Sequence, residues 1–277
     1  MEKLTLQSRK ILNNRVKIPL LGFGVAEIAE DLKTQVKILR EAIEVGYRFF
    51  DTAQIYRSER AVGIAVRESG VSREEFFIST KILWQQKYDA TIESFEESLR
   101  KLQMDYVDRF VHHWPVPGKY LESWKDMEKI NRSGRARSIA VSNYEIWHLR
   151  NLFQHNEIMP VVNQLEFNPE LTIQEHIAFC EAYGIAVEAF TPIGRGGRFL
   201  QNPVLVQVAK KYGKSVPQVI LRWDLQHGLI TVPRTSNRKH MEENADVFDF
   251  QLDAKDMAAI DGLNQNKKIN FNPYDQV

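Results

Sequence analysis

Four side chains that could together protonate a carbonyl oxygen follow hydrophobic stretches of this sequence: Asp51, Tyr56, Lys81 and one histidine of FVHHWPVP at 110–117. A free tyrosine has a pKa of about 10, but a neighbouring ammonium group stabilises the phenolate and lowers that pKa. An aspartate keeps the lysine charged, and a neutral histidine can donate a hydrogen bond to the carbonyl. The set therefore predicts protonation of a developing alkoxide.

Other interpretations of these residues remain open at this point. A lysine or aspartate at the end of a strand is often half of a structural ion pair. Lys81 could also be the Schiff-base lysine of an aldolase-like barrel. Neighbouring residues of a strand point to opposite faces, so only one of His112 and His113 can face a site. Four compatible residues at neighbouring strand ends favour the proton-transfer interpretation.

The surrounding elements alternate along the whole chain. Short apolar stretches are each followed by a longer segment with helical spacing, as in Ile92, Phe95, Leu99 and Leu102. Strands are predicted near 18–24, 47–52, 76–80, 106–113, 137–144, 161–167, 185–190 and 229–234. Helices are predicted near 59–69, 89–104, 120–134, 145–156, 173–184, 203–226 (two) and 253–263, with one more after the first strand.

About eight such units predict an α/β fold of the (β/α)8 TIM-barrel type, formed as a single domain over residues 1–277. A doubly wound sheet is the competitor, but no Gly-x-Gly-x-x-Gly follows the first strand and no Gly/Pro/Ser-rich linker divides the chain. An N-terminal β-hairpin is predicted over 3–19, with Asn13 and Asn14 at its turn. It either closes the bottom of the barrel or decorates an edge.

Composition narrows the classes of partner. The 277 residues carry a net charge of +1, with signs mixed along the chain, so neither nucleic acid nor an acidic membrane is an expected partner. Cys180 is the only cysteine and falls on an apolar helical stripe, which excludes an intrachain disulfide. No apolar run is long enough to span a bilayer, and no signal-peptide core opens the sequence. We expect a cytoplasmic monomer that acts on a small molecule.

In a barrel of this type the C-terminal strand ends carry the functional groups. Seven predicted strands end in polar residues where a structural end more often has Gly, Asn or Pro. These are Asp51, Lys81, the histidine pair, Ser142 with Asn143, Gln164, Thr191, and Arg234 with Thr235.

Motifs spread over nearly the whole chain are similar to those of the aldo-keto reductase superfamily. DTAQIYRSERAVGIAV at 51–66 resembles its DTAxxYxxExxVGxA signature, STKILW at 79–84 its lysine motif, and VHHWP at 111–115 its histidine motif. IAVSNY, VVNQLEFNP, EAFTPIGRG and TVPRTSNRKHMEEN continue the match in order. Small bacterial members that resemble diketogluconate and methylglyoxal reductases are the most similar group.

The resemblance implies a (β/α)8 barrel that reduces small aldehydes, dicarbonyls or ketones with NAD(P)H. Tyr56 would give the proton, Lys81 and Asp51 would tune Tyr56, and His113 would orient the carbonyl. The family's catalytic histidine stands directly before Trp-Pro, which selects His113 and leaves His112 facing the helices as a structural residue. No metal site is implied.

The resemblance also implies contacts to an extended NADPH. Ser142, Asn143 and Gln164 match the positions that hold the nicotinamide carboxamide, and Phe190 matches the aromatic that stacks on its ring. The other expected contacts are Gly24 and Val25 after the first strand, Thr191 and Ile193 at the pyrophosphate, Arg234, Thr235, Ser236 and His240 near the 2′-phosphate, and Glu243 and Asn244 at the adenine.

Departures from the family pattern predict an open, promiscuous substrate pocket. Ala26 replaces a common aromatic wall, Trp114 remains as an apolar wall, and Trp84 is displaced by one position. The loop after VHHWP and the tail NFNPYDQV are short. His240 stands where an arginine commonly meets the 2′-phosphate, so NADPH is expected as cofactor with a weakened preference over NADH.

Overall fold

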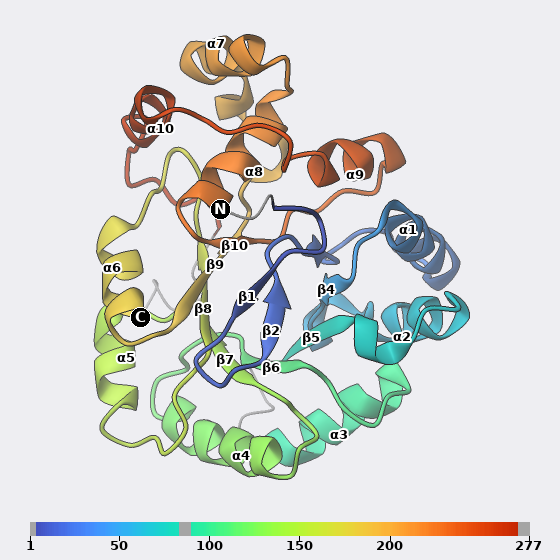
Figure 1. Ribbon diagram of the computed structural model, residues 1–277. Coiled ribbons are helices and arrows are strands. Elements are labelled where there is room, and N and C mark those ends of the chain that lie inside the picture. The colour runs from blue at the N-terminus through green and yellow to red at the C-terminus, as the bar shows by residue number, and fades with distance from the viewer. Residues whose placement is uncertain (1–3, 83–89, 271–277) are drawn as a thin grey trace.

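The fold is known from a computed structural model that describes residues 4–82 and 90–270 (Figure 1). Trp84 and most of the predicted C-terminal tail, residues 271–277, lie outside the described residues.

Within these residues, eight parallel strands form one sheet in which each strand pairs with its neighbours in sequence. The residues before the first of them pair with the last: the Gly22 amide donates to the Thr231 carbonyl (2.9 Å), and the Thr231 amide donates to the Leu20 carbonyl (3.0 Å). The sheet therefore closes, and the predicted (β/α)8 barrel is confirmed. Its strands are β3 (Phe23–Gly24), β4 (Phe49–Asp51), β5 (Phe77–Ile82), β6 (Arg109–His112), β7 (Ile139–Ser142), β8 (Val162–Glu166), β9 (Ala186–Phe190) and β10 (Ile230–Thr231).

Helices surround this barrel (Figure 1). They are α1 (Leu32–Val45), α2 (Glu59–Glu68), α3 (Thr91–Leu102), α4 (Tyr120–Arg132), α5 (Ile146–Leu152), α6 (Gln174–Ala182), α7 (Pro203–Tyr212), α8 (Val216–Gln226), α9 (Arg238–Ala245) and α10 (Ala254–Asp261). Short 3-10 turns are η1 (Gln54–Tyr56), η2 (Arg73–Glu75), η4 (Gly194–Gly196) and η5 (Arg198–Gln201).

The helix ends follow local capping chemistry. The Asp31 carboxylate accepts from the Thr34 amide at 2.9 Å and so begins α1, while Gly46, at φ 113°, ends it. Only glycine adopts that backbone conformation without strain from a Cβ atom. Ser215 and Gln218 form a reciprocal capping box at the start of α8.

The N-terminal hairpin pairs β1 (Arg9–Ile11) with β2 (Lys17–Pro19) in antiparallel register. Asn13 and Asn14 occupy the turn, and their side-chain amides donate to the carbonyls of Pro160 (3.0 Å) and Arg137 (3.1 Å). The hairpin crosses the N-terminal end of the barrel (Figure 1). The predicted hairpin is confirmed, and of its two possible positions it takes the one that closes the bottom of the barrel.

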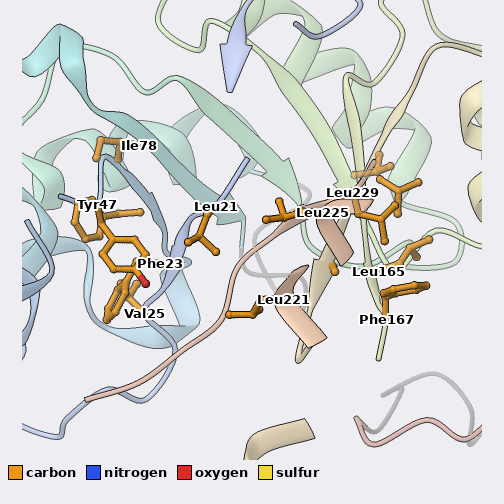
Figure 2. Packing of buried hydrophobic residues seen from close by; sticks show 14 of the residues in the cluster. Leu21, Phe23, Val25, Tyr47, Ile78, Leu165, Phe167, Leu221, Leu225 and Leu229 are labelled. Carbon is orange, nitrogen blue, oxygen red and sulfur yellow. The ribbon is translucent and has the colours of Figure 1, made fainter. Parts of the chain in front are cut away.

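Two apolar clusters stabilise the barrel. The inner cluster joins Leu12 and Ile18 of the hairpin region to inward-facing strand residues such as Phe49, Phe77 and Val111. The outer cluster lies between strands and helices. Figure 2 shows part of it, with Phe23, Tyr47 and Ile78 in one region and Leu165, Phe167, Leu225 and Leu229 in another. Alternation along each strand therefore decides which residues face the barrel interior.

One strand boundary and one helix differ from the prediction. The strand expected over 18–24 is divided, because Ile18 and Pro19 pair in the hairpin, residues 20–22 contact Thr231 of β10, and Phe23–Gly24 pairs with β4. Helix α9 was not anticipated. Its sequence RKHMEENA is almost entirely polar, and only Met241 and Asn244 are buried, so it offers little hydrophobic periodicity.

Candidate active site

A large cavity lies at the C-terminal end of the barrel strands. Its volume is about 1610 Å³. Among the residues predicted to act there, the lining includes Gly24, Val25, Ala26, Asp51, Tyr56, His113, Trp114, Ser142, Asn143, Gln164, Phe190, Thr191, Ile193, Arg234, Thr235, Ser236, His240, Glu243 and Asn244. Lys81 is absent from this lining and is fully buried.

Tyr56 reaches the cavity at the end of η1, the turn that follows β4. The Gln54 side-chain amide anchors this turn to α3 by donating to the Ser94 carbonyl and to the Ser98 hydroxyl, both at 2.8 Å. Arg57 then ends the turn at φ 55°. The phenol ring is thus held in a fixed place on the cavity wall.

Beneath Tyr56 lies a buried ion pair. The Lys81 ammonium group donates to the Asp51 carboxylate at 2.5 Å and to the Thr52 carbonyl at 3.2 Å. Its Nζ atom is 5.1 Å from the centre of the Tyr56 ring. β4 and β5 pair in parallel, which places Asp51 and Lys81 side by side at the top of the barrel interior.

The two charges hold each other ionised. Burial raises the pKa of Asp51, but the cations of Lys81 and Arg109 outweigh burial and bring that pKa below its usual value. Burial lowers the pKa of Lys81, and the Asp51 carboxylate reverses this and brings it above its usual value. Lys81 is therefore neither neutral nor exposed, which argues against a Schiff-base role.

The electrostatics of Tyr56 correct the sequence-based expectation. Burial raises the pKa of Tyr56 more than the Lys81 ammonium group lowers it, so the net shift is upward. The predicted net lowering is wrong, because a phenolate in the cavity wall loses more hydration than one cation restores. Tyr56 therefore keeps its proton at neutral pH, while Lys81 limits the rise.

The adjacent histidines point in different directions. The His113 ring meets the Tyr56 ring edge-on, with centroids 5.8 Å apart, and lines the cavity. His112 lies outside the cavity lining, with its Nδ1 atom 2.9 Å from the Tyr144 hydroxyl. Burial, reinforced by Lys81, lowers the pKa of His113 well below its usual value. His113 is therefore neutral and can donate a hydrogen bond.

Two charged residues that the sequence analysis did not single out fill the barrel interior. Arg109 of β6 and Glu188 of β9 are both 0% exposed and form a bidentate ion pair, with distances of 2.6 and 2.9 Å. A second contact joins Arg109 to Asp51 at 3.3 Å. The signal was a charged residue in each of two mostly apolar strands, RFVH and AVEAF.

Ser142, Asn143 and Gln164 converge at the strand ends of β7 and β8. The Ser142 hydroxyl donates to the Gln164 backbone carbonyl (3.1 Å), and the Asn143 amide donates to the His113 carbonyl (3.0 Å) and to the Ser142 hydroxyl (3.1 Å). Asn143 has φ 63°, a left-handed conformation that asparagine tolerates better than most residues. Three polar side chains thus face one part of the cavity.

Phe190 lies next to them, at the end of β9. Thr191 follows at φ 55°, and its hydroxyl accepts from the Asn270 side-chain amide at 3.0 Å. The Glu166 carboxylate holds this segment by accepting from the amides of Ile269 (2.6 Å) and Asn270 (2.9 Å). Glu166 and Asn270, which the motifs did not single out, thereby fix the chain near Phe190.

Arg234 also lines the cavity and reaches across to the loop after β3. Its guanidinium donates to the Ala26 carbonyl at 2.6 Å and to the Glu27 carboxylate at 3.2 Å. His240 lines the cavity from α9, whereas Arg238 does not and instead pairs with Glu44 at 2.6 Å. A compensating swing of Arg238 toward the cavity would have to break that pair.

Trp114 and Ala26, the two residues predicted to border the substrate, both line the large cavity. Trp114 borders both the large cavity and an adjoining one of about 440 Å³. Ala26 has only a methyl side chain and so takes up little of the cavity.

The lining suits a dinucleotide cofactor. Ligand pockets are typically about 300–1,000 Å³, and this one is larger. The lining combines amide and hydroxyl groups, the aromatic ring of Phe190, and the nitrogen donors of Arg234 and His240. A carboxamide, an aromatic ring and a phosphate would each meet complementary groups.

Comparisons with known proteins show the family to which this (β/α)8 barrel belongs. The aldo/keto reductase family model matches residues 20–265. The chain is 46% identical to the glyoxal reductase of Bacillus subtilis over 95% of each chain. It is 37% identical to the methylglyoxal reductase of Escherichia coli, over 92% of this chain and 93% of that one.

A solved structure has the same fold. The aldo-keto reductase of Bombyx mori in complex with NADP matches with a TM-score of 0.89 and 35% identity over 95% of each chain. The chain belongs to the aldo/keto reductase family, and it is an oxidoreductase that reduces carbonyl compounds. In the described residues, no helix is both long and apolar enough to cross a membrane.

Proposed function

We propose that this protein is an NADPH-dependent reductase of small aldehydes and α-dicarbonyls, with Tyr56 as the proton donor and NADH as a weaker alternative cofactor. The observation that carries the proposal is the position of Tyr56 and His113 on the cavity wall, above the buried ion pair of Lys81 and Asp51. The names of the glyoxal and methylglyoxal reductases among its relatives support this substrate class.

The reaction adds a hydride and a proton to a carbonyl group and yields an alcohol. A bound reduced nicotinamide supplies the hydride to the carbonyl carbon. Tyr56 donates its proton to the oxygen, and the nearby Lys81 ammonium stabilises the phenolate that forms. Neutral His113 donates a hydrogen bond to the same oxygen and orients the carbonyl. Asp51 keeps Lys81 charged and in place.

The cofactor would extend across the barrel mouth. Ser142, Asn143 and Gln164 would hold the carboxamide, and Phe190 would stack on the nicotinamide ring. The remaining contacts would come from Gly24, Val25, Thr191 and Ile193 along the chain of the cofactor, from Arg234, Thr235, Ser236 and His240 at the 2′-phosphate, and from Glu243 and Asn244 at the adenine.

The substrate would enter between Ala26 and Trp114. A methyl group on one side and an indole on the other give an apolar opening with few fixed polar groups. Such an opening favours small carbonyls, including aromatic aldehydes, with modest discrimination between them. We further propose that residues 1–277 act as one domain, as a monomer and in the cytoplasm.

Substitution of Tyr56 tests the proposed proton donor. Tyr56→Phe keeps the ring and removes the proton, so kcat for methylglyoxal should fall by about 10²–10⁴-fold. The Kd for NADPH should change little. Loss of reduced-nicotinamide absorbance gives the rate, and quenching of tryptophan fluorescence gives the Kd. A Tyr56→Phe variant that retains most of the wild-type kcat would refute the assignment.

The same assay separates a reductase from a binding protein. A panel of aldehydes, α-dicarbonyls and keto-sugars with NADPH and NADH in parallel should include several reduced compounds. Tight NADPH binding without reduction of any of them would favour the binding role instead.

A further inference from the structure

A network of five polar side chains fills the barrel interior directly below the cavity. Asp51, Lys81, Arg109, Gln164 and Glu188 come from five different strands, and each is at most 5% exposed. Two cations balance two anions. Buried charges of this kind persist only when each is paired and hydrogen-bonded.

Arg109 is the most highly coordinated member of this network. Its guanidinium forms two bonds to Glu188, and its Nε atom donates to the Ser79 hydroxyl at 3.0 Å. The rings of Phe49 and Phe77 flank it, with centroids 5.3 and 5.9 Å from Cζ. A planar fork held on all sides has one accessible orientation.

That orientation directs a remaining N–H group of Arg109 at Asp51. The Oδ1 atom of Asp51 lies 3.3 Å from Arg109, while Oδ2 accepts from Lys81 at 2.5 Å and from Gln164 at 3.0 Å. The carboxylate therefore cannot rotate without losing a bond. Arg109 in this way fixes the group that holds Lys81 beneath Tyr56.

The same pair fixes the amide of Gln164. Its nitrogen donates to both Asp51 and Glu188, and carboxylates accept but do not donate. The amide oxygen must therefore lie on the other side, where the Ser142 hydroxyl is 3.4 Å away. Gln164 also lines the cavity, so its amide belongs both to this network and to the cavity wall.

We propose that Arg109, clamped by Glu188, is a positioning residue that ties two functions together: it aligns Asp51 and Lys81 for proton transfer by Tyr56, and through Glu188 it turns the Gln164 amide oxygen toward the cofactor carboxamide. The proposal deepens the proposed function and rests on it.

A purely structural role for the pair is the alternative. Replacing a buried ion pair with apolar residues is often neutral for stability, whereas removing one partner is costly. The informative variants are therefore Arg109→Met, Glu188→Gln and the double variant Arg109→Met/Glu188→Met. Arg73→Met is the matched control, because Arg73 forms a 2.8 Å pair with Asp108 at the opposite end of the barrel.

Three quantities are measured for each variant: Tm, the Kd for NADPH by fluorescence quenching, and kcat for methylglyoxal from pH 6 to 10. The Kd for NADPH should rise by about tenfold in the double variant, because one hydrogen bond to the cofactor would be misdirected. The control should lower Tm and leave both other quantities at the wild-type value.

The pH above which kcat falls, the alkaline limb of its pH profile, should move in opposite directions in Arg109→Met and in Glu188→Gln. Arg109 lowers the pKa of Lys81, a smaller effect than burial and the opposing pull of Asp51, so its removal moves the limb to higher pH. Glu188→Gln leaves the Arg109 charge unbalanced and moves the limb to lower pH. A structural role would change Tm without separating the two variants in this way.

A folded double variant with the wild-type Kd for NADPH would overturn the proposal. Folded Arg109→Met and Glu188→Gln variants whose alkaline limb has not moved would overturn it as well. If Arg109→Met does not fold, the double variant and Glu188→Gln still decide. If the wild-type protein reduces no carbonyl, the proposed function fails, while the Kd measurements still test whether Arg109 and Glu188 orient Gln164.

Discussion

Replacing Lys81 with methionine removes one charge from beneath Tyr56 and keeps most of the side-chain volume. The Lys81 Nζ atom is 5.1 Å from the Tyr56 ring centroid and is fully buried. With the phenolate charge placed at that centroid and an effective dielectric constant of about 20, the attraction is about 3 kcal/mol. Lost from the transition state, this energy corresponds to about a 200-fold fall in kcat.

The fold should survive this substitution. Asp51 keeps its bonds to Arg109 (3.3 Å) and to Gln164 (3.0 Å), so the carboxylate is not left alone. The loss of stability should therefore lie near or below the low end of the roughly 3–5 kcal/mol typical of a broken buried pair. Thermal unfolding measures it.

The pH profile gives a second check. Lys81 lowers the pKa of Tyr56 against the larger effect of burial, so its removal raises that pKa further. Tyr56 then stays protonated to higher pH, and the alkaline limb of the residual kcat should move upward. Nicotinamide absorbance with saturating methylglyoxal and NADPH provides both measurements.

Lys101→Met is the control, because Lys101 is half-exposed on α3 and forms a surface ion pair with nearby Glu97 at 2.8 Å. Its kcat should equal that of the wild type. A folded Lys81→Met variant with kcat within about threefold of wild type, less than about 1 kcal/mol by the same conversion, would refute the electrostatic reasoning.

Three further predictions have defined outcomes. His113→Ala should lower kcat/KM far more than His112→Ala. His112→Ala should mainly lower Tm, because it breaks the bond to the Tyr144 hydroxyl. Equal losses of kcat/KM would contradict the assignment of His113, rather than His112, to the cavity. His240→Arg should raise the preference for NADPH over NADH, measured as a ratio of Kd values, because a guanidinium binds phosphate better than an imidazole; an unchanged ratio would place the 2′-phosphate elsewhere. Burial raises the pKa of Asp224 well above its usual value, so the folded state holds a proton that the unfolded state releases above about pH 4, and this residue lowers stability as pH rises toward its folded pKa. The Tm of Asp224→Asn minus the wild-type Tm should therefore increase between pH 5 and 9. A difference in Tm that stays constant with pH would be inconsistent with a retained proton on Asp224.

The sequence by itself determined the architecture and most of the cavity lining. Alternation of apolar strands with amphipathic helices predicted the barrel, because each unit must bury one face of its helix against the sheet. Strand ends such as Asp51 and Gln164 stood out because polar residues there have no packing role. Family-like motifs then gave each position an expected partner.

Only the tertiary structure decided the electrostatics. Burial sets the direction of the Tyr56 pKa shift, and burial depends on every element around the cavity. Arg109 and Glu188 are 79 residues apart, so nothing in their local sequence specified a pair. The polar helix α9 was likewise missed, since few of its residues pack against the barrel.

The position of the hairpin illustrates the same division. Asn13 and Asn14 predicted a turn from their backbone preferences alone. Where that turn lies depended on its partners, the carbonyls of Pro160 and Arg137, which loops distant in sequence bring to the bottom of the barrel. Local chemistry fixes what a short segment can form, whereas the contacts between segments fix where it lies and which charges it meets.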